Sequence, residues 1–144
     1  MGETIQLGDI RIDFLVEADD SDGSVTVFEC SVAAGARVPA PHSHDAFEET
    51  IYGLEGTLTW TVEGEPHEIG PGDSVCIRRG QVHGFDNRTD EAAKCLCIAS
   101  PGVFGPSYFR DLREVVAAGG PPDIAAIMDV MRRHGLTPAR AVAR

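Results

Sequence analysis

The sequence predicts an all-β sandwich or barrel followed by a pair of short α-helices. Between residues 9 and 101, short runs of β-branched and aromatic residues recur between turns that contain glycine or proline. Many short strands with regular turns are typical of a sandwich or a barrel. After Pro101 the apolar residues recur at helical spacing instead. The 144 residues are enough for one domain with a buried core.

The strands are predicted from alternation and from turn residues. Ile10, Ile12 and Phe14 alternate with the charged Arg11 and Asp13, which is the period of a half-buried strand. A turn at residues 21–24 separates this strand from the next one. Further strands are predicted at residues 25–32, 57–62, 75–77 and 95–99.

Two helices are predicted near the carboxyl end. The first begins with Ser107 as its N-cap and ends at the glycines 119–120. The second follows residues 121–123 and carries basic residues at 132–134, where positive charge suits the helix dipole, before Gly135 ends it. Residues 1–104 are therefore predicted to form the β-domain, and residues 105–144 a helical extension. The extension is expected to pack on the β-domain or on a partner subunit; a lid over the barrel mouth is the alternative.

Two blocks carry most of the chemical information in the chain. The first reads Gly35-x6-His42-x-His44-x4-Glu49-x6-Gly56, and the second reads Gly72-Asp73-x6-Gly80-x2-His83-x3-Asn87. Imidazole and carboxylate groups together bind divalent first-row metal ions. His42 and His44 face the same way if their stretch is extended, because side chains alternate along a strand. The pattern predicts a metal site.

The two blocks resemble the two conserved motifs of the cupin superfamily. The likeness covers about residues 25–101, and its core motifs lie at 35–87. The resemblance implies a double-stranded β-helix, or jelly-roll, barrel that holds one divalent metal ion per chain. It implies iron, manganese, nickel, zinc or copper as the metal, with four protein ligands: His42, His44, Glu49 and His83.

The same resemblance implies a metal-dependent enzyme of small-molecule metabolism, most like single-domain quercetin-dioxygenase-like cupins. On this hypothesis the substrate carries an enol or aromatic group, and Glu49 doubles as the catalytic base if it loosens from the metal. A zinc-dependent cyclase or isomerase is a second possibility. A non-catalytic cupin that binds a small molecule is a third, because fold and motif do not determine the reaction.

Four residues are predicted to line a substrate pocket. Phe85 and Asn87 follow His83 at two-residue steps, so they share its face if the strand continues. Phe47 and Trp60 could form the wall of a pocket for an apolar or aromatic ligand. The alternative for Phe47 and Trp60 is an ordinary position in the core.

The composition limits the expected binding partners and the expected cellular compartment. The net charge is −11, from 12 basic and 23 acidic residues, and no cluster of Lys and Arg occurs. We therefore expect neither a nucleic-acid nor a membrane partner. The first residues lack the pattern of a signal peptide, and four cysteines are expected to be thiols, so a cytoplasmic location is predicted. Cys95 and Cys97 could share a strand face and reach a metal, although small buried residues of this kind are usually core. The exposed helix stripes and the cupin resemblance predict a homodimer.

Overall fold

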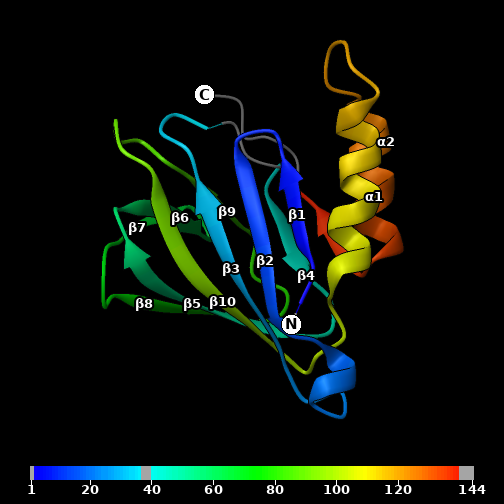
Figure 1. Ribbon diagram of the computed structural model, residues 1–144, viewed down its shortest axis with the longest axis horizontal. Helices are drawn as coiled ribbons and strands as arrows, with labels where there is room; N and C mark the ends of the chain where they lie inside the picture. The colour runs from blue at the N-terminus through cyan, green and yellow to red at the C-terminus, as the bar shows by residue number, and fades with distance from the viewer. Residues whose placement is uncertain (1, 37–39, 140–144) are drawn as a thin grey trace.

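The fold is the predicted double-stranded β-helix barrel with two helices near its carboxyl end (Figure 1). The computed structural model describes residues 2–36 and 40–139. Paired strands are antiparallel in both sheets. The six-stranded sheet has the order β1 (Thr4–Leu7), β2 (Ile10–Val16), β3 (Thr26–Val32), β10 (Ala93–Ser100), β5 (Glu48–Glu55) and β8 (Ser74–Ile77). The five-stranded sheet has the order β11 (Leu136–Pro138), β4 (His42–His44), β9 (His83–Asp86), β6 (Leu58–Val62) and β7 (Glu65–Ile69).

Alternation of buried and less buried side chains builds the core between the sheets. On β3, every second residue from Thr26 to Val32 is buried, and the residues between them are only partly covered. The strand β10, which pairs with β3, repeats this pattern from Ala93 to Ala99. Each large apolar side chain buried in this way contributes roughly 1.5–3 kcal/mol to stability.

The strands β1, β5, β7 and β11 were not among the predicted strands. Pro66 lies within β7, and Pro138 ends β11. These two strands form the opposite edges of the five-stranded sheet. Because an edge strand has one side that makes no ladder hydrogen bonds, it accepts a proline that a central strand would exclude. Both prolines therefore fit their positions at the edges of the sheet.

The two predicted helices are present as α1 (Pro106–Ala117) and α2 (Ile124–Arg133). The expected N-cap at Ser107 is wrong, because α1 begins at Pro106 with Gly105 before it. Proline suits the first helical position, where its missing N–H has no partner to lose. Asp123 caps α2, accepting a hydrogen bond of 3.0 Å from the backbone N–H of Ala126.

The helices lie against the barrel of their own chain. α1 packs on β1 and on α2, and α2 packs on β11 (Figure 1). The residues that α1 buries are Pro106, Tyr108, Phe109 and Leu112. The segment after residue 105 thus supplies two helices and one strand of the barrel. None of the helices in the described ranges is long and apolar enough to cross a membrane.

Candidate metal centre

Three histidines from neighbouring strands meet inside the barrel. His42 and His83 are direct cross-strand partners on β4 and β9, and such partners point to the same face of a sheet. His44 lies two residues along β4, on that same face. The ring centroids are 4.8 Å apart for His42 and His83, and 4.4 Å apart for His44 and His83. One ligand nitrogen from each ring lies within 4.8 Å of the other two, so these rings could hold a metal ion.

The carboxyl-terminal segment holds the histidine strand in place. β11 pairs with β4 on the side opposite β9. Beyond the ladder, the backbone N–H of Asp45 donates to the carbonyl of Gly135, and that of Ala139 donates to the carbonyl of Pro41, each at 2.9 Å. The Thr137 hydroxyl donates to the Asp45 carboxylate at 2.7 Å. β4 is therefore supported by hydrogen bonds along both of its edges.

A glycine turn directs His83 toward the other two histidines. Gly80 has a φ of +85°, a region that favours glycine. Its backbone N–H donates to the carbonyl of His44 at 2.9 Å. The bend at Gly80 thus connects the second motif directly to the first.

The hydrogen bonds of the rings favour metal binding. Nδ1 of His42 lies 3.1 Å from the carbonyl of Ala40, and Nδ1 of His83 lies 3.0 Å from the carbonyl of Gln81. A ring N–H that donates to a carbonyl leaves Nε2 with a free lone pair, which is the usual arrangement around a metal. Nδ1 of His44 is buried without a hydrogen-bond partner among the described residues. The three histidine rings therefore fit a divalent metal ion.

Burial keeps the histidines neutral. Desolvation, together with the charge of the neighbouring rings, lowers the pKa of His42 to about 4 and that of His44 to about 2. Desolvation also lowers the pKa of His83. Neutral imidazole is the form that binds a metal, so no proton has to leave these rings at neutral pH.

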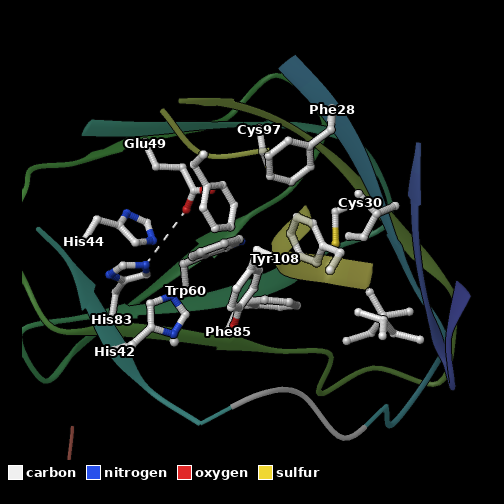
Figure 2. Close-up of a pocket in the computed structure, with 16 residues that line it drawn as sticks. Phe28, Cys30, His42, His44, Glu49, Trp60, His83, Phe85, Cys97 and Tyr108 are labelled. Atoms are coloured by element: carbon white, nitrogen blue, oxygen red, sulfur yellow. Dashed lines mark ion pairs between the residues drawn. The ribbon is translucent and has the colours of Figure 1, made fainter. Parts of the chain in front are cut away.

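Glu49 reaches the centre from the other sheet. Its strand, β5, belongs to the six-stranded sheet, and its Oε1 lies 3.9 Å from Nε2 of His83 (Figure 2). The carboxylate is not part of the group of ring nitrogens that gather within 4.8 Å of one another. Burial, and then the nearby Cys95, raise the pKa of Glu49 to about 8. A divalent cation beside the carboxyl would favour its charged form, so its position fits a fourth ligand.

A cavity of about 60 Å³ opens beside the histidines and Glu49. Trp60 and Phe85, both predicted pocket residues, lie on its wall with their rings stacked at 4.7 Å. Most of the remaining lining is apolar and comes from both sheets and from the segment around α1: Leu7, Ile10, Ile12, Phe28, Cys30, Gly84, Cys97, Phe104, Tyr108 and Phe109 (Figure 2).

The other two predicted pocket residues do not line the cavity. Phe47 stacks on the ring of His44, with centroids 4.1 Å apart, and supports this histidine from outside the cavity lining. Asn87 follows the last residue of β9, so the parity that placed it beside Phe85 no longer applies. Its side-chain N–H groups donate to the carbonyls of Val32 at 3.2 Å and Glu91 at 2.8 Å. The Asn87 side chain thus ties its own loop to the end of β3.

Comparison with known proteins establishes the family. A family model described as "Cupin domain" matches residues 28–99, which is half of the chain. The chain is a cupin.

Individual relatives of this cupin have several chemistries. The quercetin 2,3-dioxygenase of Bacillus subtilis (strain 168) is 30% identical over 112 residues, which are 77% of this chain but only 32% of the relative. A solved sugar phosphate isomerase from a cupin superfamily, from Silicibacter pomeroyi, is 25% identical with a TM-score of 0.57, covering 65% of this cupin and 60% of that chain. A predicted oxalate decarboxylase from Thermotoga maritima is 18% identical with a TM-score of 0.63, covering 69% and 90%, which shows the fold alone. The cupin spans about a third of the curated relative.

Several lining residues lay outside the sequence prediction. Phe104, Tyr108 and Phe109 follow the part of the cupin that matches the family model. The helical spacing of the apolar residues after Pro101 indicated a helix, but it did not indicate what the apolar side of that helix would contact. The alternation on β3 could have revealed Cys30 as an inward-facing residue. Cys97 was expected in the core or as a metal ligand, and it lies on the wall of the cavity. Neither cysteine belongs to the group of potential metal ligands among the described residues.

Proposed function

We propose that this cupin is a metal-dependent enzyme that acts on a small organic molecule, with dioxygenase-like chemistry on an enol or aromatic substrate. The observation that carries the proposal is the convergence of His42, His44 and His83 on an apolar cavity beside a buried carboxyl group. The similarity to a quercetin 2,3-dioxygenase supports this reaction class.

The histidines would hold the ion, with Glu49 as a fourth ligand. A bound ion would supply Lewis acidity and, where it is redox-active, a place for substrate and dioxygen to meet. Iron, manganese, nickel, copper and zinc all suit this donor set, because geometry and availability decide among them more than ligand type does.

The protein itself contributes a base and a dry cavity. A bound cation would keep the Glu49 carboxyl ionised, and a carboxylate oxygen that loosens from the metal takes the enol proton of the substrate. The aromatic walls exclude water from the reacting groups. Phe47 and the backbone carbonyls of Ala40 and Gln81 keep the histidine rings in place.

The first experiment is to measure the metal content of untagged protein, purified without chelating resin, by elemental mass spectrometry. A His83→Ala variant removes one ligand, and His67→Ala, on the exposed strand β7, is the matched control. Near-stoichiometric iron, manganese, nickel or copper that is lost only in His83→Ala, together with oxygen uptake on an enol substrate, would support the proposal.

Two other results would change the proposed reaction or exclude catalysis. Zinc alone, with turnover but no oxygen uptake, would favour a cyclase or isomerase. A chain that binds no metal even after reconstitution would contradict the catalytic proposal and leave a barrel that binds a small molecule.

A further inference from the structure

We propose that Tyr108 and Trp60 form a second recognition point in the cavity. It selects a compact ligand that carries one more oxygen atom than the oxygens that face the histidines. This inference rests on the proposed function, because it concerns the same cavity. It assigns a specificity role to a residue of α1, which lies beyond the part of the chain that matches the family model.

Both side chains bury a donor that the protein does not use. Tyr108 and Trp60 are each only 3% exposed and line the cavity. The Tyr108 hydroxyl and the Trp60 indole N–H have no hydrogen-bond partner among the residues that the structure describes. Burying a polar group without a partner is costly, and such a group therefore calls for an explanation.

The surroundings hold both rings still. The ring of Tyr108 packs against Phe104 and Phe109, with centroids 5.0 Å away in each case. The ring of Trp60 stacks on Phe85 at 4.7 Å and lies 6.3 Å from His83. Packing against neighbouring rings thus fixes both side chains and leaves their polar atoms without a partner among the described residues. Rigidly held donors are the arrangement that a specific binding site requires.

The chemistry of the two groups determines what they recognise. An indole N–H can only donate, and a phenol hydroxyl donates readily. The matching ligand group is an acceptor, such as a carbonyl, ether or hydroxyl oxygen. The cavity volume of about 60 Å³ is far below the ~300–1,000 Å³ of pockets for drug-sized ligands. The ligand is therefore expected to be much smaller than a drug-sized molecule, with a metal-binding enol group and one additional oxygen.

Two probes differ by this additional oxygen. Kojic acid and allomaltol are 5-hydroxy-4-pyrones with the same chelating hydroxyketone, and kojic acid has a hydroxymethyl group where allomaltol has a methyl group. We would titrate each into nickel-loaded protein by calorimetry. Fluorescence provides a second readout, since Trp60 is the single tryptophan of the chain.

Wild-type protein should bind kojic acid at least about tenfold more tightly than allomaltol. A site that hydrogen-bonds a hydroxyl group binds a ligand without that group more weakly. In Tyr108→Phe this preference should fall by about threefold or more, because only the Trp60 indole N–H remains to bind the additional oxygen, while the affinity for allomaltol stays the same. Tyr52→Phe is the matched control, because Tyr52 is the other tyrosine of the chain and is 43% exposed. It should keep the full preference.

The thermal stability of the ligand-free protein separates recognition from a structural role. Tyr108→Phe should unfold at the same or a higher temperature than wild type, because the hydroxyl has no bond to lose. A clear drop in unfolding temperature would overturn the inference.

The binding results distinguish this inference from the proposed function. Metal-loaded protein that binds both probes equally, or neither, overturns the second recognition point while leaving the metal centre intact. Protein that fails to take up nickel contradicts the proposed function and this inference with it.

Discussion

At the scale of single residues, Glu48 and Glu49 show how one step along a strand separates two environments. The Glu48 carboxylate faces outward and accepts hydrogen bonds of 2.6 and 2.7 Å from the guanidinium of Arg79, which lowers the pKa of Glu48 to about 2. Glu49 faces inward, where burial raises its pKa to about 8. Adjacent residues on a strand point to opposite faces, so of these two carboxyl groups only Glu49 can act in the cavity.

Replacing Glu49 with glutamine should therefore lower turnover of the enol substrate by roughly 10²–10⁴-fold, the usual contribution of a general base. Glutamine keeps the size of the side chain but cannot accept the proton. The measurement is the steady-state rate, with bound metal determined on the same sample. Glu48→Gln is the control and should keep its activity. Full turnover by Glu49→Gln with its metal intact would rule out the role of base.

Site residues could be predicted where local spacing decides the direction of a side chain. The step from His42 to His44 requires only an extended strand. Asn87 was misplaced because β9 ends at Asp86 and the spacing rule ends with it. Tyr108 was not predicted because its position depends on how α1 docks on the barrel, and no local pattern contains that information.

At the scale of elements, the strand β11 links the helical extension to the candidate metal centre. Leu136, its first residue, is 1% exposed and is the cross-strand partner of His44. This pairing joins segments that lie some ninety residues apart in the chain. The extension therefore supports the histidine strand as well as one wall of the cavity.

Leu136→Ala should lower the free energy of unfolding by about 2–5 kcal/mol, the range for truncating a buried leucine. It should also weaken metal binding, because β4 loses packing on the side that faces β11. Chemical denaturation and metal titration measure the two effects. Leu15→Ala provides the control, since Leu15 is 50% exposed. A variant that loses stability but keeps its full metal affinity would show that β11 does not support the site.

The contact between α1 and α2 should depend on pH. Oδ2 of Asp111 lies 2.7 Å from Nε2 of His134, and this hydrogen bond is the main reason why the pKa of Asp111 is below its ordinary value of 3.8. A carboxyl group with a lowered pKa stabilises the fold above that value and loses this contribution as the pH falls below it. Asp111→Asn should therefore be less stable than wild type at neutral pH.

The stability difference between wild type and Asp111→Asn should close as the pH falls below 3.8. Urea denaturation across this range measures it. Asp129→Asn is the matched control, because Asp129 binds Arg133 within α2 at 3.0 Å instead of joining the two helices. Stability curves that stay parallel for wild type and Asp111→Asn would contradict the assignment of this contact.

At the scale of the whole molecule, the candidate ligands come from both sheets. His42, His44 and His83 belong to the five-stranded sheet, and Glu49 belongs to the six-stranded one. A bound ion would therefore connect the two layers of the barrel. The all-β class was predictable because alternation is a property of each strand. The pairing of the strands was not, because it joins distant segments such as β4 and β11.

This arrangement predicts that metal removal destabilises the whole cupin. A ligand that binds only the folded state at 100 times its Kd adds about 2.7 kcal/mol, which in a domain of this size corresponds to roughly 5–10 °C in Tm. Calorimetric scans of metal-loaded and chelator-treated protein measure the shift. His67→Ala should show the same shift and His83→Ala almost none, because only His83 lies at the centre. If loss of a stoichiometric ion left the Tm of wild type unchanged, the ion would not bind between the sheets, and the ligand set drawn from both layers would be wrong.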